Sequence, residues 1–205
     1  MTIKKSWDEV TLNDYIQLQQ IVNSNIPEDY QLSNMVALLT GLSIETIENL
    51  PLSQFLQLGN ELKFMNEKPT RNGHKNEYIL NGTTYVLTED ISKLTTAQFL
   101  DFQNYQKEQP IDYCKILSCF LIPKGHSYND GYDLNKTFND MGCMLVPDFQ
   151  GLFFFLRLQS VSLYLILVDY SKQEMKKMKI SKEKRKQLVQ QLEILSHSMG
   201  FLLTL

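Results

Sequence analysis

The sequence has few of the residues that form reactive or cross-linked sites. It contains three cysteines and three histidines in 205 residues. Three cysteines cannot all pair, and the beginning, MTIKKSWDEV, lacks the apolar stretch of a secretory signal. We therefore expect reduced thiols and a cytosolic location. Cys114 and Cys119 are five positions apart, but no second pair or nearby histidine completes a metal site, so we expect both in the core.

A long uninterrupted apolar run is also missing. The most apolar segment, 151–168, reads GLFFFLRLQSVSLYLILV and contains Arg157, Gln159 and two serines. A membrane-spanning helix needs about 20 mostly apolar residues, and an arginine near its centre costs about 2.5–3.5 kcal/mol on insertion. We expect a helix buried within the protein, or against another subunit, and no membrane span.

No large charge of one sign is present. The net charge of −3 argues against a general nucleic-acid binder. Segment 172–186 is nevertheless basic, with eight lysines and arginines against two glutamates. It fits a solvated helix face or a contact with an acidic protein surface, and its lack of interleaved aromatic residues disfavours nucleic acid. The residues we single out for a charged contact are Lys176, Lys177, Lys184 and Arg185.

Motifs for catalysis or metal binding are absent from the sequence. It has no HExxH, GxSxG or P-loop pattern. His126 with Asp130 and Asp133 could outline a metal loop, but the order of the ligands fits no known loop geometry. The acidic pairs at 8–9 and 89–90 precede helix starts, where negative charge is stabilising. We expect no catalytic residue, no cofactor, no bound metal and no enzymatic activity.

What the sequence does contain is a repeated helix-start pattern. It reads VTLNDYIQL at 10–18, LPLSQFLQL at 50–58 and LTTAQFLDF at 94–102. Thr11 and Thr95 can cap helices, and Gln98 can complete a capping box with Thr95. The spacings of 40 and 44 residues permit a helical repeat, but the intervening segments do not match. A weak repeat and independent helix starts therefore both remain open.

An Asn-Gly pair gives the clearest local signal. Asn81-Gly82 separates two β-prone runs, 77–80 and 83–88, and predicts a type I′ hairpin with Leu80 opposite Thr83 and Tyr78 opposite Tyr85. Two strands alone are marginally stable in water, so this hairpin must pack on helices or pair with another chain. Its open edge could dock a partner.

The remaining chain predicts helices. We expect a mainly α fold, a multi-helix globular domain with one small β-hairpin at about residues 77–88. It forms a single helical domain over 1–205, with a subdivision into 1–66 and 77–205 joined by an exposed, mobile linker. The predicted helices cover about 12–23, 30–40 ending at Gly41, a short turn at 43–49, 51–65, 96–107, 110–122, 134–141, 147–179 and a last helix capped by Ser181.

Several segments together resemble a known family. They are SWDEVTLNDYIQLQQI at 6–21, LLTGLSIETIENLPLSQF at 38–55, NGTTYVLTEDISKLTTAQFLDF at 81–102, SCFLIPKG at 118–125 and the phenylalanines 153–155. These resemble small proteins of tailed bacteriophages, and the nearest class is the phage tail assembly chaperone family. The resemblance implies a mainly helical protein that binds the tape-measure protein, recruits tail-tube subunits and has no catalytic residue.

The residues and the resemblance give one functional hypothesis and two alternatives. The first is a non-enzymatic phage tail assembly chaperone in the host-cell cytoplasm, with phage proteins as partners and homo-oligomers permitted. The second is a structural component of the virion, such as a connector, tail or packaged cargo protein. The third, an enzyme, would require a pocket with convergent polar groups. The aromatic residues we expect at an interface are Phe153, Phe154, Phe155, Tyr78 and Tyr85.

Overall fold

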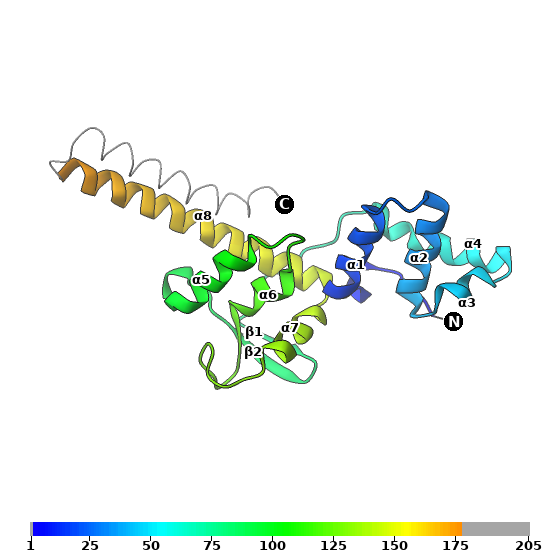
Figure 1. Ribbon diagram of the computed structural model, residues 1–205, viewed down its shortest axis with the longest axis horizontal. Helices are drawn as coiled ribbons and strands as arrows, with labels where there is room; N and C mark the ends of the chain where they lie inside the picture. Colours follow the sequence, from blue (N-terminus) through cyan, green and yellow to red (C-terminus); the bar gives the residue numbers. More distant parts are fainter. Residues whose placement is uncertain (1, 178–205) are drawn as a thin grey trace. The chain divides into compact units, whose positions relative to one another are not determined.

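The computed structural model describes residues 2–177, and within them the chain is mainly helical with one small antiparallel sheet (Figure 1). The predicted fold class is confirmed. The helices are α1 (Leu12–Val22), α2 (Glu28–Thr40), α3 (Ile44–Glu48), α4 (Leu52–Glu61), α5 (Thr96–Tyr105), α6 (Tyr113–Ser118), α7 (Leu134–Gly142) and α8 (Val146–Lys177). The strands are β1 (Glu77–Leu80), β2 (Thr83–Leu87) and β3 (Leu121–Pro123), and three short 3-10 helices are η1 (Trp7–Glu9), η2 (Leu62–Asn66) and η3 (Ile91–Lys93).

The chain forms two compact units. Unit 1 contains the residues up to His74 together with Asn139–Leu152. Unit 2 contains Lys75–Phe138 and, among the described residues, those from Phe153 to Lys177. The first change of unit falls inside the linker expected at 66–76, whereas the sequence does not predict the return of 139–152 to unit 1.

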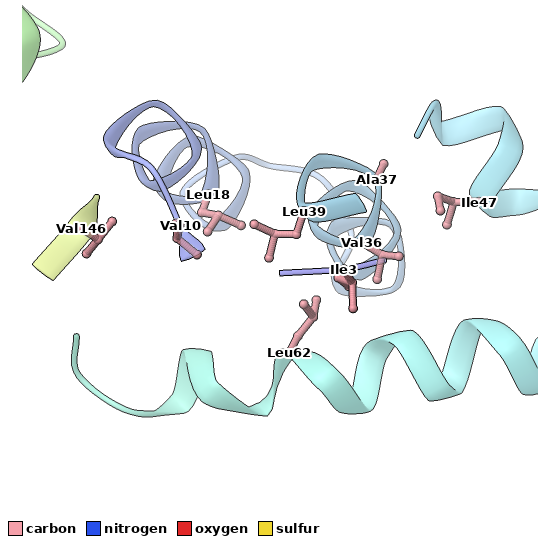
Figure 2. Packing of buried hydrophobic residues seen from close by; sticks show 9 residues of the cluster. All are labelled: Ile3, Val10, Leu18, Val36, Ala37, Leu39, Ile47, Leu62 and Val146. Atoms are coloured by element: carbon pink, nitrogen blue, oxygen red, sulfur yellow. The ribbon is translucent and has the colours of Figure 1, made fainter. Parts of the chain in front are cut away.

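Unit 1 is built around a hydrophobic cluster between α1, α2 and the start of η2, which follows α4 (Figure 2). Leu39 of α2 points toward Leu18 of α1, whereas Val36 of α2 lies beside Ile3, with Leu62 nearby. The full set of buried members is Ile3, Val10, Leu18, Val36, Ala37, Leu39, Ile47, Leu62 and Val146. Burial of these side chains is the main favourable free-energy term for unit 1.

A backbone pairing attaches the segment before α8 to the start of α1. Thr11 and Leu145 form an antiparallel bridge. The N–H of Leu12 donates to the carbonyl of Met144 over 2.7 Å, and the N–H of Val146 donates to that of Val10 over 2.9 Å. These bonds explain why residues far apart in sequence belong to one unit.

Capping side chains define the start of α1. The hydroxyl of Thr11 accepts a bond from the backbone N–H of Asp14, and the carboxylate of Asp14 accepts one from the backbone of Thr11. Lys4 also donates to this carboxylate. Burial of Asp14 opposes its ionisation, but the hydrogen bonds from Lys4 and Thr11 outweigh burial and lower its pKa. The predicted N-cap at Thr11 is confirmed.

Two further helix ends agree with prediction. Thr95 and Gln98 form the expected capping box at the start of α5, and α2 ends at Gly41 in a left-handed conformation with φ of 71°. The left-handed region is open to glycine because it has no Cβ, so the chain can turn there without strain.

The hairpin has the predicted register, with Leu80 opposite Thr83 and Tyr78 opposite Tyr85. The helix predicted from Pro110 to the residues before Pro123 is confirmed over Tyr113–Ser118 and wrong at its end. Its place is taken by α6, capped by the side chain of Asp112, and by β3, which pairs with β2. The short strand supplies backbone partners that β2 would otherwise lack, as in the 2.8 Å bond from the N–H of Lys124 to the carbonyl of Thr84.

The long helix predicted from Pro147 is confirmed as α8. Along its described side chains, Leu152, Leu156 and Ser160 are buried at helical spacing, whereas Phe154 and Leu158 are 39% and 50% exposed. One face of this apolar segment therefore packs inward, as expected of a buried helix. Within residues 2–177 no helix is long and apolar enough to cross a membrane. The predicted last helix and its cap Ser181 lie outside the described residues.

Candidate protein-binding surfaces

The two hairpin tyrosines expected at an interface lie in the core. Tyr78 and Tyr85 are 3% and 1% exposed. Successive side chains of a strand point to opposite faces, so the neighbour Ile79 lies on the outer face and is 77% exposed. The sequence prediction therefore chose the wrong face of the hairpin for contact, and Ile79 is the exposed apolar residue that it missed.

The three consecutive phenylalanines of α8 have different environments. Phe153 packs edge-on against Tyr113, with ring centroids 5.7 Å apart, and Phe155 is half-buried. Phe154 is the most exposed of the three, and Leu158 lies one turn further on the same side of the helix. The predicted contact of these residues with a partner stays a prediction, with Phe154 as its surface residue.

Two of the four basic residues predicted to make a charged contact lie within the described residues. Lys176 and Lys177 lie at the end of α8. Lys184 and Arg185 lie outside the described residues. Their role in a charged contact stays a prediction.

One edge of the sheet presents unpaired backbone groups. The strand order is β1-β2-β3, so the outer side of β1 is an edge. The N–H of Leu87 donates to the carbonyl of Asn76, and in this register Tyr78 and Leu80 also bond to β2. The N–H and carbonyl groups of Glu77 and Ile79 then point outward, and no residue in 2–177 gives them a backbone partner.

The outer face beside this edge combines apolar side chains with one ion pair. Val86, opposite Glu77 in the hairpin, is 36% exposed. The ammonium group of Lys124 lies 2.8 Å from the carboxylate of Glu77. We call β1 with its exposed Ile79 the β1 edge.

Unit 1 carries an open groove between α1 and α2, which we call the α1–α2 groove. Its volume is about 570 Å³, and it extends over the loop after α1 and the start of α3. It is lined by Gln17, Gln20, Ile21, Ser24, Ile26, Asn34, Ala37, Leu38, Gly41, Leu42 and Ile44. None of these residues is charged. Ile26 and Ile44 are 37% and 40% exposed.

The uncharged lining sets what the α1–α2 groove can bind. A charged ligand would lose hydration there and gain no ion pair from the lining. An amphipathic helix could place apolar side chains against Ile26, Leu38 and Ile44, and the glutamines and Asn34 could hydrogen-bond at the border. A second hollow in unit 1, of about 530 Å³, has a different character, because the Lys5–Glu61 ion pair lies among its lining residues.

A polar cluster in unit 2 contains the chain's best-buried thiol. The hydroxyl of Tyr128 donates to the carboxylate of Asp101 over 2.8 Å, and the side chain of Gln98 donates to the carbonyl of Cys119 over 3.0 Å. Burial raises the pKa of Cys119 to about 12, and burial likewise raises the pKa of Tyr128. A protonated, solvent-inaccessible thiol is a poor nucleophile, so the cluster serves to hold α5 against the segment around β3.

The histidine loop does not assemble the outlined metal site. The Nδ1 atom of His126 faces the carbonyl of Asp130, 3.3 Å away, and the carboxylate of Asp133 accepts bonds from the first backbone N–H groups of α7. Among residues 2–177, no three histidine, cysteine or acidic side chains lie close enough together to hold a metal ion.

The fold and these surfaces describe a mainly helical protein with two candidate protein-binding surfaces, the α1–α2 groove and the β1 edge. Comparisons with protein-family models, with curated proteins and with solved structures find no match to this chain. The likeness to phage tail assembly chaperones therefore rests on the residues quoted from the sequence.

Proposed function

We propose that this protein is a non-enzymatic phage tail assembly chaperone that binds a helical segment of the tape-measure protein in the α1–α2 groove. The observation that carries the proposal is the uncharged groove with exposed Ile26 and Ile44 on its walls. An apolar groove on a protein surface is a common site for the apolar face of a partner helix.

A helix is the kind of ligand that an apolar groove between two helices suits. An α-helix with its side chains is about 10–12 Å across, so a groove between two helices accepts one row of its side chains at i, i+3, i+4 and i+7. Ile26 and Ile44 present exposed apolar surface in the groove lining. Burial of their exposed area by a partner would contribute about 25 cal/mol for each Å² removed from water.

The identity of the partner comes from the resemblance. Tail assembly chaperones bind the tape-measure protein, a long helical protein, and recruit tail-tube subunits to it. A protein with this role acts in the host-cell cytoplasm before the tail is complete. The alternative role, a structural component of the virion, uses the same kind of contact but requires that the chain remain in the finished particle.

Co-expression with the tape-measure protein tests the proposal. Ile26→Lys and Ile44→Lys place a charge in the groove, and we expect either change to reduce the co-purified tape-measure protein on the order of tenfold or more. Leu52→Lys is the matched control, because Leu52 is also an apolar residue of unit 1, is 70% exposed and lies outside the groove. Binding that is absent, or unchanged in the groove variants, contradicts the proposal.

Mass spectrometry of purified particles separates the two roles. A chaperone that leaves before completion is absent from finished particles or present in traces. Abundant copies in every particle would favour the structural component and contradict the chaperone.

A further inference from the structure

We propose that Asn72 is a site of spontaneous deamidation, and that its conversion releases segment 68–75 from the first turns of α8. Asn72 is followed by Gly73, and both residues are exposed in this segment, which has no regular secondary structure. The proposal rests on the chemistry of the Asn72-Gly73 pair, on the hydrogen bonds of Asn72 and on the backbone conformation of Gly73. It does not depend on the α1–α2 groove.

The reaction needs only these two residues and water. The backbone nitrogen of Gly73, after loss of its proton to the solvent, attacks the side-chain carbonyl carbon of Asn72. A bond forms between this nitrogen and the carbon, the bond from the carbon to Nδ2 breaks, and the side-chain nitrogen leaves as ammonia. Water then opens the cyclic imide at either of its two carbonyl groups, so the products are aspartate and isoaspartate. The sequence of steps consumes no oxidant or reductant.

The attacking nitrogen of Gly73 is accessible. A side chain on the residue after an asparagine shields the backbone nitrogen, and glycine has no side chain. Within residues 2–177 the N–H of Gly73 makes no hydrogen bond to backbone or side chain. A nitrogen that belonged to a helix or a strand ladder would first have to give up its bond, and this one does not.

The backbone does not require glycine at position 73. The φ angle of Gly73 lies outside the left-handed region, and a Cβ at this residue would meet no atom within 4 Å. Gly82 in the other Asn-Gly pair is different, because its φ of 77° in the hairpin turn would strain any residue with a side chain. An alanine would fit at position 73 without strain, so the glycine contributes an unshielded nitrogen next to an asparagine.

The second pair, Asn81-Gly82, is held by the hairpin. Leu80 and Thr83 pair on either side of the turn, and the φ angle of Asn81 is 47°. Ring closure at Asn81 requires a backbone rotation that opens this turn. Ring closure at Asn72 requires the release of one exposed hydrogen bond, in which its side-chain amide donates to the carboxylate of Asp148 over 2.8 Å. We therefore expect Asn72 to react faster than Asn81.

The conversion removes contacts that join segment 68–75 to α8. The side chain of Asn72 donates to Asp148, and its backbone N–H donates to the carbonyl of Pro147 over 3.1 Å. A carboxylate at position 72 has no proton to donate at neutral pH and lies next to the carboxylate of Asp148, so repulsion replaces the hydrogen bond. In isoaspartate the main chain is also longer by one carbon, so the N–H bonded to Pro147 and the carbonyl packed against Gly151 cannot both keep their places.

Peptide mass spectrometry of the full chain, incubated in mildly alkaline buffer, tests the reaction. Aspartate and isoaspartate should form at Asn72 faster than at Asn81, on the order of tenfold. Gly73→Ala is the matched control, because it keeps Asn72 and its hydrogen bonds but shields the nitrogen, and it should slow conversion at position 72 on the order of tenfold or more. Conversion at Asn72 that is undetectable, no faster than at Asn81 or unchanged by Gly73→Ala overturns the proposal.

Hydrogen exchange of Asn72→Asp tests the release, since this variant carries the aspartate product without the reaction. Protection of the amide at position 72, which bonds to Pro147, should fall on the order of tenfold relative to the wild type. The amide of Leu12, which bonds to Met144 elsewhere in unit 1, should keep its protection and shows that the unit remains folded. Unchanged protection at position 72 in Asn72→Asp overturns the release of the segment.

Discussion

Replacement of Gly151 by alanine should destabilise unit 1, although the change favours the helix that contains it. Gly151 is buried in α8, and a Cβ at this position would lie 2.0 Å from the carbonyl oxygen of Asn72. That carbonyl cannot move freely. The backbone N–H of Asn72 donates to the carbonyl of Pro147 over 3.1 Å, and its side chain donates to Asp148 over 2.8 Å.

The expected magnitude follows from opposing contributions. Alanine is favoured over glycine within a helix by about 1 kcal/mol. An added methyl group that meets fixed backbone costs about 1–3 kcal/mol. If the segment at Asn72 moves away to relieve the contact, each lost hydrogen bond costs a further 0.5–1.5 kcal/mol or so. We therefore expect Gly151→Ala to lower the free energy of unfolding by about 1–3 kcal/mol.

Urea unfolding of Gly151→Ala and Gly59→Ala measures the difference directly. Gly59 lies within α4, where a Cβ would meet the side chain of Leu32 at 3.6 Å, an ordinary contact. This control should gain up to about 1 kcal/mol from helix propensity alone. If Gly151→Ala is as stable as the control, the segment at Asn72 does not rest against α8 and the reasoning is refuted.

Three further predictions concern single side chains. The pKa of Asp14 is lowered in the folded state, so its contribution is complete above its usual value of 3.8 and is lost as the pH falls through the lowered pKa. Urea unfolding should therefore show Asp14→Asn less stable than wild type by about 1–2 kcal/mol at neutral pH, a difference that disappears in acid; a constant difference would contradict this. In the native protein, a thiol reagent should modify the exposed Cys143 readily and reach the buried Cys114 and Cys119 only after unfolding; rapid modification of all three contradicts the described burial. Thr95→Ala should reduce stability by about 1 kcal/mol in thermal unfolding and Thr95→Ser should not, because only the serine keeps the cap; equal losses would exclude the cap as the cause.

Local signals in the sequence predicted the parts of the fold that depend on near neighbours. The capping box of Thr95 and Gln98 and the Asn81-Gly82 turn each involve residues at most three positions apart. Their backbone requirements are specific, since a type I′ turn needs positive φ at both central residues. Asn81 and Gly82 have φ of 47° and 77°, as that turn requires.

Features that depend on distant pairing could not be predicted in the same way. Strand β3 has three residues, Leu121–Pro123, and its apolar composition equally fits the end of a buried helix. What makes it a strand is the unpaired side of β2, more than thirty positions earlier in the chain. The Thr11–Leu145 bridge, which returns residues 139–152 to unit 1, has no local signal at all.

The candidate binding surfaces could be predicted from the sequence only in part. Alternation along the hairpin separates Tyr78 and Tyr85 from Ile79 and Val86, but period alone does not say which face is buried. The face with the tyrosines also holds Leu80 and Leu87 and is the more apolar, which would have identified it as the inner one. The α1–α2 groove arises from the packing of two helices, and single-sequence periodicity does not reveal a gap between them.

The proposal on which the account of function depends is that this chain binds a partner helix in the α1–α2 groove. Hydrogen exchange of the chain with and without the tape-measure protein tests it most directly. The account predicts slower exchange in 17–26 and 34–44, the segments that contain the groove residues, when the partner is bound. Exchange unchanged in both segments, despite saturating partner, would contradict it.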